Sequence, residues 1–159
     1  MAAKHRLWHL GWARYGTMAN SLASMVKAKG TKFDIVIGIA RGGIPLAMVI
    51  ADAIEVRMDI INVKSYTGIR QRGKPMILST LTSGIKGKRV LLVDDLIEEG
   101  ETMHTVLGFL SKEKPLEIRT AVLFKKPWSK FEPDFYLKVV DKWIVFPWDR
   151  FETRRIVNK

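Results

Sequence analysis

Two adjacent carboxylates followed by a glycine-containing turn form the most distinctive chemical pattern in the chain. Asp94 and Asp95 end a strand-like apolar run over 90–93, and Gly100 and Thr102 follow a few residues later. A turn that leads into a helix presents backbone N–H donors to an anion, and paired acids accept hydrogen bonds from hydroxyl groups. The pattern therefore outlines a site for a sugar phosphate. The alternative is an acidic first turn that only complements the helix dipole.

A second turn follows another strand-like run. The segment 33–40 is rich in β-branched residues and is followed directly by Arg41, Gly42 and Gly43. A guanidinium offers a fork of donors suited to phosphate oxygens, and glycine lets the backbone approach a ligand closely. Taken alone, this tripeptide is typical of an ordinary turn. Its position after a strand makes it a candidate anion-binding loop.

The elements that must position these residues alternate between strand and helix patterns. Such alternation predicts an α/β fold built on a mainly parallel sheet flanked by helices, with ligands bound beyond the carboxyl ends of the strands. Residues 65–75 are rich in glycine and basic residues and predict an exposed mobile loop or hairpin. We expect helices over 15–26, 44–54 and 102–110, and strands over 33–40, 58–63, 77–81, 88–95, 118–124, 135–140 and 143–146.

The composition predicts one soluble globular domain over residues 1–159. The chain is 47% hydrophobic and 27% charged, and it has no apolar run near the roughly 18 residues that a membrane-spanning helix needs. We therefore expect a cytoplasmic protein with no membrane partner. Cysteine is absent, which excludes disulfides, thiolate zinc sites and cysteine nucleophiles. The net charge of +11 attracts anions without choosing among nucleic acids, membranes and phosphorylated metabolites.

The segment 90–102 resembles the signature of type I phosphoribosyltransferases, which bind 5-phosphoribosyl 1-pyrophosphate (PRPP). The resemblance implies that Asp94 and Asp95 hold the ribose hydroxyls and that the following turn holds the 5'-phosphate. It assigns pyrophosphate to the Arg41 loop, and a flexible loop opened by Ser65 and Tyr66 is expected to close over PRPP. The implied PRPP-binding residues are Arg41, Gly42, Gly43, Ser65, Tyr66, Asp94, Asp95, Glu98, Glu99, Gly100, Glu101 and Thr102.

The segments 123–128 and 141–149 are similar to those of the xanthine-guanine and archaeal purine members of this family. The resemblance implies a small purine-binding hood over about 125–150, in which Lys126 donates to the purine 6-oxo group. Trp143 would stack on the purine ring, and the Ile144 main chain would face its 2-position edge. Lys125 competes with Lys126, but the alignment with the following proline favours Lys126. The other four tryptophans are expected to be packing residues: Trp8, Trp12, Trp128 and Trp148.

Two glutamates depart from the family pattern. Glu98 stands where relatives have an aspartate that is proposed as the general acid/base. Its side chain is one methylene longer and can fill the same role. Glu99 replaces a hydroxyl that binds phosphate, and like charges about 4 Å apart cost on the order of 1 kcal/mol in water. Glu99 either points away while the backbone binds phosphate, or weakens PRPP binding, or is bridged by a metal or lysine. We favour the first, because such sites depend chiefly on main-chain donors.

The expected reaction transfers the phosphoribosyl group from PRPP to N9 of guanine, hypoxanthine or xanthine, giving a nucleoside monophosphate and pyrophosphate. Arg41 and Glu98 are the expected catalytic residues, and Mg²⁺ is expected near Asp94 and Asp95, held mostly through ligand and water. Relatives lead us to expect a homodimer or homotetramer, with nucleic acid an unlikely partner. Two alternatives stay open: a regulator of the same fold that senses PRPP or nucleotide, with or without RNA, and an enzyme for another base such as adenine.

Overall fold

The computed structural model describes residues 7–68 and 71–157 of the 159-residue chain. No helix in these ranges is both long and apolar enough to span a bilayer. The elements follow in the order β1 (Leu7–His9), α1 (Trp12–Ala28), β2 (Ile35–Ala40), α2 (Gly43–Ala53), β3 (Arg57–Gly68), β4 (Gln71–Ile77), β5 (Arg89–Ile97), α3 (Glu101–Ser111), β6 (Glu117–Lys125), β7 (Phe135–Val139), β8 (Trp143–Val145) and α4 (Arg150–Val157).

A six-stranded, mostly parallel sheet forms the centre of the molecule. Its strand order is β4-β3-β2-β5-β6-β7, and only the β3–β4 pair at one edge is antiparallel. The central strands β2 and β5 are long apolar runs because both of their faces are covered, as parallel sheets require. The expected α/β fold is therefore confirmed.

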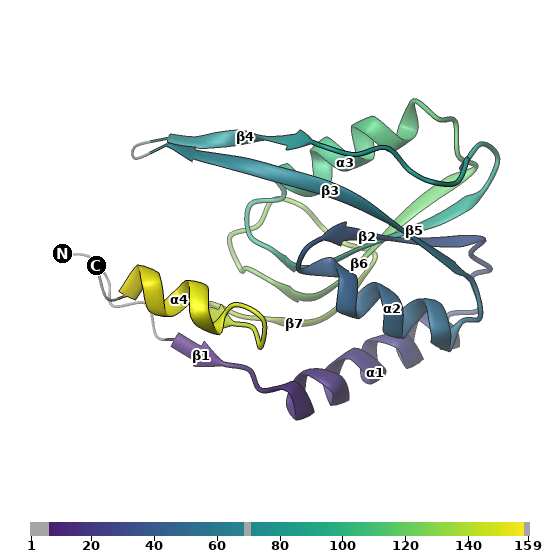
Figure 1. Ribbon diagram of the computed structural model, residues 1–159. Helices are drawn as coiled ribbons and strands as arrows, with labels where there is room; N and C mark the ends of the chain where they lie inside the picture. The colour runs from purple at the N-terminus through teal and green to yellow at the C-terminus, as the bar shows by residue number, and fades with distance from the viewer. Residues whose placement is uncertain (1–6, 69–70, 158–159) are drawn as a thin grey trace.

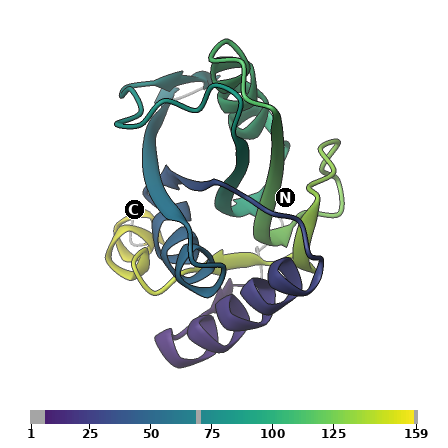
Figure 2. The same cartoon turned by 90° about the vertical axis from the view of Figure 1, so that its right-hand side faces the viewer.

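Helices cover both faces of the sheet (Figures 1 and 2). Helices α1 and α2 lie on one face, and α3 lies on the other. Two hydrophobic cores follow from this arrangement. One joins α1 and α2 to residues such as Leu91 and Val93 of β5, and the other joins α3 to Val90 and Leu92. Alternating side chains of one strand thus reach opposite cores.

A second, two-stranded sheet ties the start of the chain to its C-terminal third. β1 pairs in parallel with β8, and the pairing sets Trp8 opposite Ile144. The backbone N–H of Leu10 continues this connection by donating to the Val145 carbonyl at 3.0 Å. β8 lies within the segment of about 125–150 that was expected to form the purine-binding hood, so the N-terminal strand is tied to that segment.

The structure corrects several sequence expectations. Residues 65–75 belong to a hairpin of β3 and β4 over the described positions, with a register shift between Ser65 and Thr67, so the hairpin alternative is confirmed, while the mobility of this segment and its closure over PRPP stay predictions. The return strand is Gln71–Ile77, earlier than the predicted 77–81. β5 continues past the paired acids to Ile97, and the sequence reasoning missed β1 and α4 altogether.

Candidate active site

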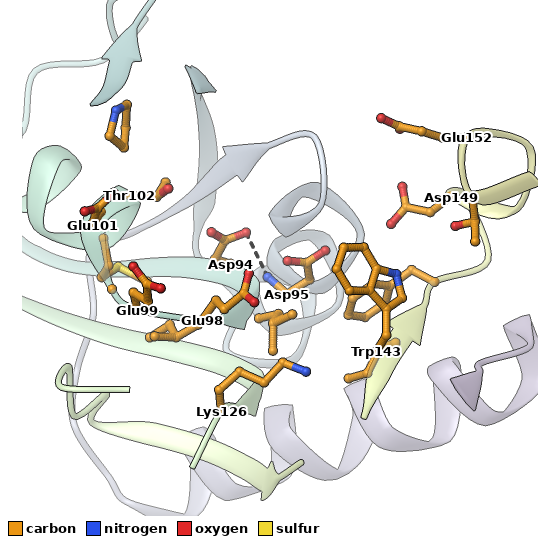
Figure 3. Close-up of a pocket in the computed structure, with 18 residues that line it drawn as sticks. Asp94, Asp95, Glu98, Glu99, Glu101, Thr102, Lys126, Trp143, Asp149 and Glu152 are labelled. Carbon is orange, nitrogen blue, oxygen red and sulfur yellow. Dashed lines mark hydrogen bonds between the residues drawn. The ribbon is translucent and has the colours of Figure 1, made fainter. Parts of the chain in front are cut away.

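A pocket of about 460 Å³ lies beyond the carboxyl ends of β5 and β6, where ligands bind in sheets of this kind (Figure 3). Its volume falls in the usual range of about 300–1,000 Å³ for small-molecule sites. The sequence predicted ten of its lining residues, and these come from three separate segments of the chain. They are Asp94, Asp95, Glu98, Glu99, Gly100, Glu101, Thr102, Lys126, Trp143 and Ile144.

The two aspartates at the pocket floor lie on opposite faces of β5. The Asp95 backbone N–H donates to Asp94 Oδ1 at 2.9 Å, which fixes the Asp94 carboxyl (Figure 3). Burial, together with the charge of Asp95, raises the pKa of Asp94 well above its ordinary value. Burial and the charge of Asp149 raise the pKa of Asp95 to about 7. The carboxyls therefore lack countercharge, and hydroxyl or cationic partners would stabilise both.

The loop after β2 packs directly against this acid pair. A Cβ atom at Gly42 would lie 2.1 Å from Asp95 Oδ2, so a side chain at this position would displace the carboxyl. At Gly43 a Cβ would lie 2.4 Å from the backbone oxygen of Val93, which is equally close. Both glycines are thus needed for the loop to approach β5, as the sequence pattern suggested.

Arg41 is directed toward the C-terminal helix. Its Nη2 lies 3.2 Å from Glu152 Oε2 of α4, and both side chains are exposed. An exposed pair of this kind contributes little to stability, with a typical value of about 0–1 kcal/mol. Arg41, Gly42 and Gly43 are not among the residues that line the pocket, but Arg41 contacts Glu152, which is, and an anionic ligand can replace that contact at low cost.

The turn between β5 and α3 has the geometry of an anion-binding helix start. Gly100 has a φ of 97°, a left-handed conformation that favours glycine, and α3 begins at the next residue. A Cβ atom at Gly100 would also lie 2.5 Å from Phe131 Cβ, so the turn packs against the chain after β6. The first residues of α3, Glu101 and Thr102, line the pocket, and the backbone N–H groups of a first helical turn have no partners within the helix. Glu99, expected to point away, is among the lining residues and is exposed.

Lys126 is the basic residue of the pocket wall and is only 4% exposed. Its Nζ donates to the backbone carbonyl of Lys142, and its backbone N–H donates to the Ile97 carbonyl at 2.9 Å. Burial lowers the pKa of Lys126, and the charges of Glu98 and Asp141 act in the opposite direction. The ammonium is thus held in a fixed position between β6 and the β7–β8 connection.

The neighbouring Lys125 takes a different direction. Its Nζ forms an ion pair with Glu132 and lies 5.6 Å from the centre of the Tyr136 ring. Because successive side chains of a strand point to opposite faces, only one of two adjacent lysines at the end of β6 enters the pocket. That residue is Lys126, in line with the sequence alignment.

Two residues of β8 complete this side of the pocket. Trp143 is 43% exposed and lies at the pocket opening, beside Asp95 and Asp149 in Figure 3. The Val145 carbonyl accepts a hydrogen bond from the N–H of Leu10, directly after β1. Peptide groups alternate in direction along a strand, so the N–H and C=O of Ile144 face away from β1. The Trp143 ring and the main-chain donor and acceptor of Ile144, which face away from β1, are therefore adjacent in β8.

The charge of the pocket differs from that of the chain. Seven of the lining residues are acidic, although the whole chain carries +11: Asp94, Asp95, Glu98, Glu99, Glu101, Asp149 and Glu152. Sequence reasoning gave no role to Asp149 and Glu152, which reach the pocket from the start of α4. The signal was available, because an Asp followed three residues later by Glu is typical of a helix start. The side chains of Ser65 and Tyr66 lie outside the described part of the structure.

The fold and the pocket agree with a comparison to known protein families. The model of the phosphoribosyl transferase domain matches residues 13–151. The chain belongs to the phosphoribosyltransferase family. This phosphoribosyltransferase therefore has the type I fold, and the expectation of an enzyme of this type is confirmed.

Individual relatives of this phosphoribosyltransferase cover most of its length. A xanthine-guanine phosphoribosyltransferase of Idiomarina loihiensis is 31% identical over 147 residues, which cover 91% of this chain and 88% of that protein. One of Cereibacter sphaeroides is 29% identical over 150 residues, covering 89% and 86%. The crystal structure of a purine phosphoribosyltransferase from Pyrococcus horikoshii is 34% identical with a TM-score of 0.79, and the match covers 89% of this chain and 93% of that one.

Proposed function

We propose that this enzyme transfers the 5-phosphoribosyl group of PRPP to N9 of a 6-oxopurine, namely guanine, hypoxanthine or xanthine, and releases pyrophosphate. The observation that carries the proposal is the buried Lys126 ammonium in the same pocket as the paired acids and the turn before α3. An ammonium only donates hydrogen bonds, so it favours a 6-oxo acceptor over the exocyclic amine of adenine. The names of the relatives support the same substrate class.

In this proposal the phosphoribosyl end of the substrate lies over β5 and the start of α3. Asp94 and Asp95 accept hydrogen bonds from the ribose hydroxyls, and N–H groups of the turn 98–102 bind the 5'-phosphate. The loop of Arg41, Gly42 and Gly43 binds the pyrophosphate, for which Arg41 exchanges its contact with Glu152. These contacts orient C1' of PRPP toward the incoming purine nitrogen.

At the purine end, the bond from N9 to C1' forms as the bond from C1' to the pyrophosphate oxygen breaks. The proton that N9 or N7 loses passes to Glu98, whose charge already acts on Lys126. Lys126 donates to the 6-oxo oxygen, Trp143 stacks on the ring, and the Ile144 main chain faces the 2-position edge. Base stacking of this kind contributes roughly 1–3 kcal/mol in nucleic-acid complexes.

The acidic character of the pocket fits a bound Mg²⁺. The donor set consists of carboxylate oxygens, and the pKa values of Asp94, Asp95 and Asp149 are all raised by burial and by neighbouring negative charge. Among the described residues no three acidic or histidine side chains are grouped to hold a metal by themselves, so PRPP and water would supply most ligands. When bound, Mg²⁺ supplies charge neutralisation to the pyrophosphate oxygens.

Steady-state kinetics with PRPP, Mg²⁺ and four purines tests the proposal. The enzyme should use guanine, hypoxanthine or xanthine and discriminate against adenine. Lys126→Ala should raise the KM for the 6-oxopurine by roughly 10- to 100-fold, as expected for a lost hydrogen bond to a charged donor. The KM for PRPP should change less than twofold, and Lys125→Ala, which removes the lysine paired with Glu132, serves as the control. A collapse of PRPP affinity with unchanged purine preference would show that Lys126 is misassigned.

The regulator alternative is not favoured, because the residues expected at the purine end line the pocket and the relatives are named as enzymes. The homodimer or homotetramer and the cytoplasmic location stay predictions from the sequence. Light scattering coupled to size-exclusion chromatography measures the first of these directly. A monomer at micromolar concentration would contradict it.

A further inference from the structure

The Lys126 ammonium lies beside the ring of a residue to which the sequence assigned no role in the site. Trp128 lies two residues beyond Lys126, and the centre of its ring is 5.3 Å from Lys126 Nζ. Trp128 is 50% exposed, so it lies at the surface and not in the core. Within the described residues, Trp128 contacts the lysine from outside the pocket wall.

The buried ammonium is stabilised by such a partner in addition to the charges of Glu98 and Asp141, which stay in place when Trp128 is replaced. An ammonium that loses its water is destabilised unless other groups replace the hydration shell. Here one N–H group donates to the Lys142 carbonyl, and an ammonium carries three N–H groups, so it can also donate to a ligand in the pocket. The negative face of an indole attracts a cation within about 6 Å of the ring centre without using any N–H group. The ring can therefore hold the charge in place and leave the donors for the substrate.

A tight turn holds the ring over the lysine. The Ser129 backbone N–H donates to the Lys126 carbonyl at 3.1 Å and closes the turn that carries Trp128. The Phe131 N–H donates to Ser129 Oγ at 3.2 Å, and Phe131 packs against the backbone of Gly100. Because the segment 126–131 is fixed at both ends, the indole has a defined position and is not a free surface side chain.

We infer that Trp128 is a positioning residue for the purine site: its indole face, together with the Lys142 carbonyl, orients the Lys126 ammonium toward the 6-oxo group. The inference rests on the proposed function and adds to it the residue that makes the lysine selective. A second ring contact in the chain provides a natural comparison. Tyr136 lies beside Lys125, which the Glu132 ion pair keeps outside the pocket.

The test compares Trp128→Leu, Trp128→Phe and the control Tyr136→Leu with the wild-type enzyme. Trp128→Leu removes the ring, so the KM for hypoxanthine and guanine should rise roughly 3- to 30-fold, the range that a partly buried cation–π contact implies. The KM for PRPP should stay within twofold. Trp128→Phe keeps an aromatic face and should show a smaller rise, while Tyr136→Leu should leave both values unchanged.

The pH dependence separates positioning from general damage to the fold. Loss of the ring removes a group that stabilises the charged lysine, so the lysine deprotonates at lower pH. The alkaline limb of kcat/KM for the purine should therefore move to lower pH in Trp128→Leu relative to wild type and Tyr136→Leu. If Trp128→Leu does not fold, the test uses Trp128→Phe, for which a smaller shift of the alkaline limb and a smaller rise in the purine KM are expected.

Three results would overturn the inference. One is a wild-type purine KM in Trp128→Leu, and another is a parallel rise in the KM for PRPP. The third is a wild-type enzyme that turns over no 6-oxopurine, which removes the proposed function together with this inference. Turnover in the wild type with no effect of Trp128→Leu removes the inference alone, so the two failures are distinguishable.

Discussion

Substitution of Gly42 by alanine should damage catalysis more than stability. The backbone at Gly42 has φ −63° and ψ −33°, which alanine adopts without strain. The added Cβ, however, would lie 2.1 Å from Asp95 Oδ2 and 2.6 Å from its Cγ. Since ordinary contacts begin near 3.4 Å, the carboxyl must move by more than 1 Å. A displacement of about 1 Å in a reacting group can lower the rate by roughly 10²-fold.

The stability cost of this change should be small, because a side chain gives way and not the backbone. Overpacking costs about 1–3 kcal/mol, and we expect the lower end, which lowers Tm by roughly 2–4 °C in a chain of this size. Gly43→Ala provides the contrast. Its Cβ would meet the Val93 carbonyl at 2.4 Å in the middle of the sheet, so unfolding should dominate the loss of activity.

The measurement combines kcat/KM for nucleoside monophosphate formation with thermal unfolding of the same samples. Gly108→Ala is the matched control, because Gly108 lies in α3 with no atom within 4 Å of its added Cβ. It should keep wild-type kinetics and gain up to about 1 kcal/mol from helix propensity. The reasoning would be refuted if kcat/KM of Gly42→Ala were within threefold of wild type, or if the unfolded fraction of the variant explained its loss of activity.

Three further outcomes can be measured with single variants. Glu99→Thr removes a charge from the pocket lining and should tighten PRPP binding roughly fivefold, the equivalent of about 1 kcal/mol. A binding titration with PRPP measures this, and an unchanged affinity would reject the repulsion argument. Glu152→Gln frees Arg41 and should lower the KM for PRPP severalfold with Tm unchanged, whereas a higher KM would show that Glu152 assists binding. Burial raises the pKa of Asp59, but four hydrogen bonds to its carboxylate outweigh burial and hold the pKa below its ordinary value of 3.8. The contribution of Asp59 to the free energy of unfolding is therefore complete above pH 3.8 and is lost as the pH falls through the folded-state pKa. Asp59→Asn should therefore unfold about 1–3 kcal/mol more easily at pH 7, and this difference from wild type should shrink as the pH falls below 3.8. A difference that is constant with pH would contradict the assignment.

The sequence was most informative where local pattern and burial coincide. The runs that became β2, β5 and β6 are apolar because both of their faces are covered, so their existence could be predicted from composition alone. The ends of these strands were harder to predict. β5 runs through its two aspartates to Ile97 because main-chain pairing with Lys125 of β6 continues whatever the side chains are. The return strand β4 was predicted too late in the chain for the same reason, because its main chain pairs with β3 whatever the side chains are.

Elements that depend on distant partners were missed. β1 is a three-residue strand whose partner, β8, lies more than 130 residues away, and no local pattern marks so short a segment. Helix α4 is polar, with Glu152 in its first turn and two arginines in its last turn, so it lacks the apolar stripe by which a helix is usually found. Its position over the pocket follows from the packing of the C-terminal third and not from its own sequence.

The clearest limit of sequence reasoning concerns charge. A net charge of +11 predicts attraction of anionic ligands, yet the pocket that should bind a pyrophosphate-containing substrate is lined by seven acids, with Lys126 as the lysine of its wall. Net charge describes the long-range field, whereas binding depends on the groups within a few ångströms of the ligand. The two are compatible if the basic surface raises the local concentration of PRPP while Mg²⁺, Arg41 and main-chain N–H groups supply the positive charge at the site. On this argument, added salt should raise the KM for PRPP, and added Mg²⁺ should lower it, independently of each other.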